Sequence, residues 1–173
     1  MKSSRPRRPK EPELSADRLR EIGIFGALSD TTLERLTQDL AQLRFAPGEV
    51  VFKEGDPARE MFVVLDGELE VLKRSRKGRD ARVAILGPND AFGEMSIIDV
   101  MPRSATIRAL APTRLLRLRT EDLDALYRYD LKSYAIITLN VARDLSRRLR
   151  VTDGMLADFT SMVEHYGPGS YRK

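Results

Sequence analysis

Apolar residues in the first part of the chain follow the period of a helix. After Ser29, leucines occupy positions 33, 36, 40 and 43, which are spaced by three and four residues and so share one helical face. Ser29 is a suitable N-cap, because its hydroxyl can accept a hydrogen bond from a backbone N–H of the first turn. The pattern predicts a helix that begins after Ser29 and includes Leu43.

From about Arg44 the pattern changes to short runs of Val, Ile and Leu between turn signals. These signals are Pro47-Gly48, Gly55-Asp56, Asp66-Gly67, Lys77-Gly78 and Gly87-Pro88-Asn89-Asp90. Asp66-Gly67 predicts a tight type I′ hairpin between strands 61–65 and 68–73, since both central residues of that turn need positive φ. Further strands are predicted at 104–109 and 113–118. Short strands at regular spacing are typical of an antiparallel barrel or jelly roll.

The last part of the chain is predicted to be helical. Thr120 begins one helix, with Glu121 and Asp122 placed favourably at its positive N-terminal end. A long helix follows from about Asp130. Its apolar seam alternates steps of four and three residues and comprises Leu145, Leu149, Thr152, Leu156, Phe159, Val163 and Tyr166. This heptad spacing favours a helix that pairs with a second copy. The alternative is a helix packed on its own barrel. Gly154 counts against the self-paired helix, because glycine costs about 1 kcal/mol relative to alanine in a helix interior.

Composition places few further limits on the protein. The 173 residues are 42% hydrophobic and 32% charged, they contain no cysteine, and no apolar run is long enough to span a membrane. Residues 1–13 lack the apolar segment of a secretory signal. We therefore expect a cytoplasmic protein. Basic residues gather in residues 1–13, 73–82 and 143–150, which permits nucleic-acid binding. Solvated charge is the favoured interpretation, and nucleic acid is not expected as a partner.

One short segment, residues 92–106, combines several anion-binding groups. Gly93 permits close approach of the backbone to a ligand, and residues 95–98 can form a helical turn whose N–H groups face an anion. Arg103 offers a planar guanidinium for phosphate oxygens, and Ser104 adds a hydroxyl. Glu94 can accept a hydrogen bond from a ribose hydroxyl. By residue type alone, Glu94 and Arg103 could equally form a salt bridge or be two solvated charges.

The order Gly-Glu, a short apolar helix and Pro-Arg-Ser-Ala-Thr resembles the phosphate-binding cassette of cyclic-nucleotide-binding domains. Such domains occur in bacterial catabolite activator proteins, protein kinase A regulatory subunits and cyclic-nucleotide-gated channels. Residues 22–29, 47–56 and 61–67 resemble other parts of the same domain, so the resemblance covers about residues 19–150. It implies a mainly β fold with flanking helices: an eight-stranded antiparallel jelly-roll β-barrel, an N-terminal helical motif and a long C-terminal helix.

We expect the chain to divide into four parts. Residues 1–13 are expected to form a disordered basic tail, and residues 14–128 the barrel with its N-terminal helices. Residues 129–166 form a long helix that serves as a lid and as a dimerisation surface, and residues 167–173 form a flexible tail.

The resemblance also implies roles for individual residues. Glu94 binds the ribose 2′-hydroxyl and Arg103 the cyclic phosphate, which Ser104 and the backbone of Gly93, Met95, Ser96 and Ala105 help to surround. Val71, Val83 and Ala84 lie where strand residues line the sugar and base, or they are plain barrel core. Thr152 and Asp153 lie where a Thr-Ser pair meets adenine in catabolite activator proteins, with Asp153 in place of Ser. Asp153 either accepts from a base amine or is an ordinary surface charge.

Ser104 favours cAMP as the ligand, because cGMP-selective relatives often have Thr at this position. No cofactor, metal site or catalytic set is predicted. His165 is the single histidine and is interpreted as a surface residue, and neither Ser96 nor Ser104 has a neighbouring general base. We therefore expect no enzymatic activity. About twenty residues follow Asp153, too few for a DNA-binding winged helix, so a DNA-binding domain is not expected.

These observations predict a stand-alone cyclic-nucleotide receptor that signals by a conformational change. The ligand would draw the cassette inward and bring the helices from Thr120 onward over the pocket as a lid. A homodimer through the C-terminal helix and a downstream protein partner of unknown identity are expected. Three alternatives remain: a cGMP receptor, a protein-interaction module with a vestigial pocket, and a nucleic-acid-binding regulator that uses its basic tail.

Overall fold

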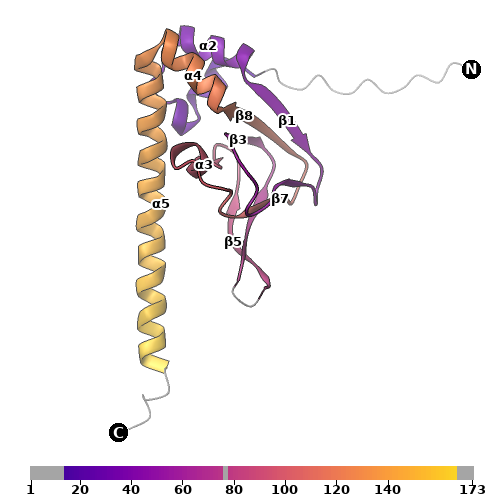
Figure 1. The fold of residues 1–173 in the computed structure, drawn as a ribbon, viewed down its shortest axis with the longest axis vertical. Coiled ribbons are helices and arrows are strands. Elements are labelled where there is room, and N and C mark those ends of the chain that lie inside the picture. Colours follow the sequence, from indigo (N-terminus) through magenta and orange to yellow (C-terminus); the bar gives the residue numbers. More distant parts are fainter. Residues whose placement is uncertain (1–13, 76–77, 167–173) are drawn as a thin grey trace, which may run out of the picture.

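The protein was analysed as a computed structural model, which describes residues 14–75 and 78–166. The two predicted tails, 1–13 and 167–173, lie outside the described residues. Figure 1 shows a β-barrel with short helices gathered at one end and a single long helix running along its side.

Eight strands form two four-stranded antiparallel sheets. The first sheet has the order β1 (Ala41–Phe45), β8 (Thr113–Arg119), β3 (Glu60–Asp66) and β6 (Ala91–Phe92). The second has the order β2 (Val50–Phe52), β7 (Thr106–Ala109), β4 (Leu69–Arg74) and β5 (Asp80–Leu86). Apart from β4 and β5, which are neighbours in the second sheet, consecutive strands lie in different sheets, as in a jelly roll. The predicted eight-stranded antiparallel fold is confirmed.

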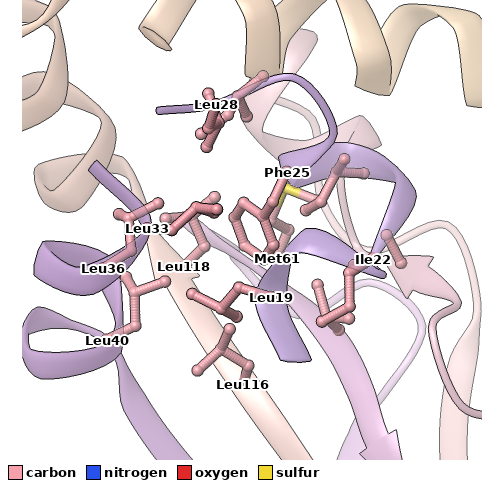
Figure 2. Packing of buried hydrophobic residues seen from close by; sticks show 14 of the residues in the cluster. Leu19, Ile22, Phe25, Leu28, Leu33, Leu36, Leu40, Met61, Leu116 and Leu118 are labelled. Carbon is pink, nitrogen blue, oxygen red and sulfur yellow. The ribbon is translucent and has the colours of Figure 1, made fainter. Parts of the chain in front are cut away.

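Strand β3 is buried on both faces, which explains its unbroken apolar sequence. Phe62 and Val64 face the barrel interior, where they pack with residues such as Leu115. The alternate residues, Met61, Val63 and Leu65, face a second cluster beneath the helices. Figure 2 shows this second cluster, to which the N-terminal helices contribute Leu19, Ile22, Phe25, Leu33, Leu36 and Leu40. The helices are thus attached to the outside of the first sheet.

The N-terminal motif comprises α1 (Ala16–Arg20), the 3₁₀ helix η1 (Gly23–Phe25) and α2 (Asp30–Asp39). Ser29 caps α2 as predicted, since its hydroxyl accepts from the N–H of Thr32 at 3.2 Å. The prediction that this helix includes Leu43 is wrong. Leu43 belongs to β1, where it pairs with Leu115 and packs against the barrel interior. Tertiary pairing therefore overrides the leucine spacing.

The predicted hairpin at Asp66-Gly67 is also wrong. Strands β3 and β4 on either side of it lie in different sheets, so they are not hydrogen-bonded neighbours. Asp66 lacks the positive φ of a type I′ turn, whereas Gly67 has φ +97°. A Cβ at Gly67 would lie 2.4 Å from Oγ1 of Thr113, so glycine is needed here for a close crossing between the sheets. The hairpin in this region instead joins β4 and β5.

Three helices follow in the second half: α3 (Met95–Ile98), α4 (Thr120–Tyr129) and α5 (Leu131–Tyr166). Asp130 ties α5 to α2, because its carboxylate accepts from the N–H of Ser133 at 3.0 Å and from the hydroxyl of Thr32 at 2.7 Å. Asn140 adds a second tie through its amide, which donates to the carbonyls of Ile24 and Gly26. The first part of α5 is therefore bound to the N-terminal motif.

The long helix predicted from about Asp130 is confirmed, and it passes through Gly154 without a break. Figure 1 shows the yellow C-terminal end of this helix reaching past the lower end of β5. Only the first seam residue, Leu145, packs against the core. The described seam residues beyond it are exposed, and the side chain of Tyr166 lies outside the described residues, as does that of His165. Among residues 14–75 and 78–166, none of the helices combines the length and apolarity needed to cross a lipid bilayer.

Candidate functional site

A pocket of about 410 Å³ lies between the second sheet and the segment that joins β6 to β7. Nine residues that the sequence predicted for a site line this pocket: Val71, Ala84, Gly93, Glu94, Met95, Ser96, Arg103, Ser104 and Ala105. Other wall residues include Phe52, Asp90, Ile107 and Arg148. The volume lies in the range of small-molecule sites, and the wall combines apolar strand residues with a few convergent polar groups.

Arg103 is 96% buried, which is unusual for an arginine. Its Nη1 donates to the carbonyl of Glu60 at 2.7 Å and to that of Gly93 at 3.2 Å. The guanidinium also lies over the ring of Phe52, 3.9 Å from the ring centroid. Its Nε is buried and has no hydrogen-bond partner among the described residues. Burial lowers the pKa of Arg103, as expected for a cation removed from water. The result is a preformed cationic group in the pocket wall.

The position of Arg103 depends on the missing side chain of Gly93. Gly93 has φ +80°, a left-handed conformation that side chains disfavour. A Cβ there would lie 2.5 Å from Nη1 of Arg103. Gly93 is therefore required both for the turn after β6 and for the space that the guanidinium occupies.

Glu94 is 95% buried, and its two carboxylate oxygens differ in their contacts. Oε1 accepts from Nη1 of Arg148 at 3.3 Å, whereas Oε2 has no partner among the described residues. Burial raises the pKa of Glu94, and the nearby positive charge of Arg148 opposes that rise only in part. A buried acceptor without a donor is costly to keep, so a ligand that opens access to Oε2 and brings a donor would relieve that cost.

The predicted helical turn at 95–98 is present as α3. Met95 and Ser96 begin this turn, so their N–H groups have no partner within the helix. Ser104 faces Met95 across the loop, with its Oγ 3.7 Å from the sulfur of Met95. Lys73 on β4 donates to the carbonyl of Ser104 and pairs with Glu54 at 2.7 Å, which ties the loop to the second sheet. These contacts hold the loop against the pocket.

Three predicted residues do not line the pocket. Val83 is 60% exposed on β5, at a bulge where Val71 pairs with Ala84 and Leu72 with Arg82, so that Val83 has no opposite residue. Thr152 and Asp153 lie further along α5 and are exposed. The hydroxyl of Thr152 donates to the carbonyl of Arg148, one turn earlier, at 3.0 Å.

Arg148 was not predicted as a site residue, yet it brings α5 into the site. Its guanidinium donates to Glu94 and to the carbonyl of Ala91, and it pairs with Asp144 at 2.7 Å. The sequence did carry a signal: Arg148 lies four residues before Thr152, so both share one helical face. The interaction with Glu94 spans 54 residues and could not be read from local spacing.

Residues 42–130 match the family model described as "Cyclic nucleotide-binding domain". The chain is 33% identical over 140 residues to the CRP-like cAMP-activated global transcriptional regulator of Mycobacterium tuberculosis, covering 81% of this chain and 61% of that protein. It is 36% identical over 130 residues to the cyclic AMP receptor protein of Thermus thermophilus, covering 75% and 58%. The chain thus spans about three fifths of the length of these relatives.

A similar solved structure is a cyclic nucleotide-binding domain from Methylobacillus flagellatus. Its TM-score is 0.75 at 27% identity, with 84% of this chain and 82% of that chain covered. The family match includes the Gly93–Arg103 geometry and all the pocket residues described above except Arg148. The chain therefore belongs to the cyclic nucleotide-binding domain family.

Proposed function

We propose that this chain is a receptor for a 3′,5′-cyclic mononucleotide, in which Glu94 binds the ribose 2′-hydroxyl and Arg103 the cyclic phosphate. The observation that carries the proposal is that a buried cation and a buried, half-satisfied carboxylate line one pocket. A cyclic nucleotide brings one anion for Arg103 and one hydroxyl donor for Glu94. The N–H groups at the start of α3 and the hydroxyl of Ser104 complete the anion's surroundings.

Binding would be transmitted to α5 through Arg148. Arg148 is bound to Glu94 on one side and to Asp144 of its own helix on the other. A ribose hydroxyl that donates to Glu94 competes with Arg148 for this carboxylate, and a phosphate gives Arg148 a competing anionic partner. The C-terminal helix then adopts a different set of contacts in the bound state. Such a switch requires that the nucleotide bind one arrangement of α5 more tightly than the other.

Cyclic AMP is the preferred ligand in this proposal. Two relatives carry cAMP in their names, and Ser104 stands where cGMP-selective relatives often have Thr. Thr152 and Asp153 do not line the pocket. A base contact from them would accompany movement of α5 over the pocket, or would come from the α5 helix of a second copy.

A second copy would pair through α5. The exposed seam residues Leu149, Leu156, Phe159 and Val163 give this helix an apolar stripe beyond the barrel. Burying such a stripe in a coiled coil removes it from water, which favours a homodimer.

Titration calorimetry with cAMP and with cGMP tests the ligand. We expect saturable cAMP binding that is at least about tenfold tighter than cGMP binding, a difference of about 1.4 kcal/mol. Tighter binding of cGMP would overturn the preference for cAMP. If the folded chain gave no binding heat with either nucleotide, the proposal that it is a receptor would be wrong. A protein-interaction module would then be favoured.

A further inference from the structure

A second cavity, of about 250 Å³, lies on the other side of the cassette helix from the nucleotide pocket. It is bounded by α3, by β3 and by the C-terminal helices α4 and α5. Most of its wall is apolar: Met61, Ile97, Ile98, Leu123, Ile137 and Val141. Of these six, none lines the nucleotide pocket, so the two sites have separate walls except at Glu94.

The size and the lining of this cavity suit a small apolar molecule. Apolar cavities of roughly 150 Å³ stay dry and can bind benzene. A cavity of about 250 Å³ has room for a bicyclic aromatic molecule. A molecule can enter from solvent, because Ile98 is 53% exposed and Thr138, which also lines the cavity, is exposed.

Glu94 adds a polar group to the wall of this cavity, so an occupant needs a hydrogen-bond donor. This residue lines both cavities, it is 95% buried, and its Oε2 has no donor among the described residues. The hydroxyl of Thr138 is not a competing donor, because it already donates to the carbonyl of Tyr134 at 2.9 Å. Once a small rotation of the Glu94 side chain opens Oε2 to this cavity, an occupant with a single N–H or O–H group would satisfy it, whereas a purely apolar occupant would leave it unsatisfied.

We propose that this cavity is a second ligand site, which takes a small uncharged molecule with an apolar, bicyclic body and one hydrogen-bond donor. This site shares Glu94 with the proposed nucleotide pocket, so its donor and the ribose hydroxyl would compete for the same carboxylate oxygen.

Methyl NMR of the nucleotide-free chain tests the proposal with indole as the probe. Indole is expected to bind saturably, with a Kd of about 1 mM or tighter, and to shift the methyl signals of Ile97, Ile137 and Val141. The methyls of Val71 and Ala84 in the nucleotide pocket are expected to stay unchanged. The proposed site would be wrong if indole did not bind saturably. It would also be wrong if the saturable shifts appeared at Val71 and Ala84 in place of the cavity residues.

Benzofuran provides the matched probe for the donor, since it has nearly the same shape and lacks the N–H. We expect indole to bind at least about fivefold tighter, the effect of one net hydrogen bond. Equal affinities would contradict the role of Glu94.

Two phenylalanine variants test where the site lies, because one adds side-chain volume inside the cavity and the other adds it beside the cavity. Thr138→Phe adds a ring at an exposed position that lines the cavity, so it should fill the cavity without crowding the core. Leu139→Phe adds bulk at the next helix position, which is 50% exposed and does not line the cavity. Indole affinity should fall at least about tenfold in the first variant and stay unchanged in the second. Equal indole affinity in Thr138→Phe and the unmodified chain, with the variant shown to be folded by its thermal unfolding, would overturn the proposal.

Discussion

The guanidinium of Arg148 donates a hydrogen bond of 3.3 Å to the carboxylate of Glu94, although 54 residues separate them in sequence. Arg148 lies on α5 and Glu94 at the start of the cassette turn, so the contact joins the long helix to the ligand pocket. It satisfies only one carboxylate oxygen, and burial still raises the pKa of Glu94. Keeping this half-satisfied carboxylate buried is therefore a cost to the stability of the fold, which its proposed role in ligand binding would explain.

This cost makes stability depend on pH in a specific direction. Because the pKa of Glu94 is raised on folding, the folded chain holds this proton more tightly than the unfolded chain. The favourable contribution is present below the unfolded pKa and is lost as pH rises through the folded pKa. Glu94→Gln should therefore be more stable than the unmodified chain at pH 7, with a gain that shrinks as pH falls into the acid range. Urea unfolding at a series of pH values measures the difference.

Glu54 provides the matched control, because its pKa is lowered by the hydrogen bond from Lys73 and by the N–H of Arg74. Its contribution to stability is present above the unfolded pKa and is lost as pH falls through the folded pKa. Glu54→Gln should therefore be less stable than the unmodified chain at pH 7, with a loss that shrinks at acid pH. Effects of the same sign in the two variants would contradict the account of Glu94.

Alanine substitutions at Gly93 and Gly78 distinguish the cost of a positive φ from the cost of a clash with Arg103. Both have similar positive φ values, +80° and +75°, so alanine at either should cost about 1–2 kcal/mol of stability. Only at Gly93 would the new Cβ meet Arg103; at Gly78 it meets nothing within 4 Å. Gly93→Ala should therefore weaken cyclic-nucleotide binding at least about tenfold, and Gly78→Ala should leave it unchanged. Equal nucleotide affinity in the two variants would show that Arg103 can move without loss of function.

Val100 in the cassette loop carries backbone strain. It has φ +53°, which is unfavourable for a β-branched residue, and its side chain is 82% exposed and so has little packing to lose. Val100→Asn should raise the free energy of unfolding by about 1 kcal/mol, because asparagine tolerates the left-handed region. Val83→Asn, at an exposed position outside that region, should bring no such gain. Denaturant titration of both variants measures the free energy of unfolding. A lower value in Val100→Asn than in the unmodified chain would contradict the claim that Val100 is strained.

The exposed stripe of α5 should hold two copies together. Leu156→Glu places a charge in the middle of the stripe, where burial against a second helix would be unfavourable. Sedimentation should then show a shift toward monomer relative to the unmodified chain. Ser161→Glu makes the same charge change on the opposite side of the helix and should leave the oligomeric state unchanged. A monomeric unmodified chain at all concentrations would contradict self-pairing.

The parts of the molecule that depend on local sequence could be predicted. Ser29 caps α2, and the apolar residues after Gly93 form α3. Both features follow from residues a few positions apart, whose conformations are set by caps, glycine and short hydrogen bonds. That Glu94 and Arg103 line one pocket was predicted from the family resemblance, since residue type alone left a salt bridge or two solvated charges open. The strand pattern likewise indicated the barrel, because alternation and turn residues are local properties.

Features that depend on distant partners could not be predicted in this way. Leu43 continues the leucine spacing of a helix, yet pairing with β8 draws it into β1. Asp66-Gly67 has the composition of a hairpin turn, yet packing beside Thr113 makes it a crossing between sheets. Arg148 reaches Glu94 only because α5 is held along the barrel by contacts such as those of Asn140 with the N-terminal motif. In each case tertiary contacts decide between local alternatives.

Titration calorimetry of the Arg103→Ala variant with cAMP tests the central claim most directly, with Arg108→Ala as the control. Arg108 is paired with Glu70 at 2.6 Å and does not line the pocket, so its removal should leave cAMP affinity unchanged. Removal of Arg103 takes away the buried cation that would bind the phosphate, which should cost at least about 1.5–3 kcal/mol, or roughly ten- to a hundredfold in Kd. We predict that loss in a folded Arg103→Ala protein. Unchanged cAMP affinity in that variant would contradict the assignment of the pocket.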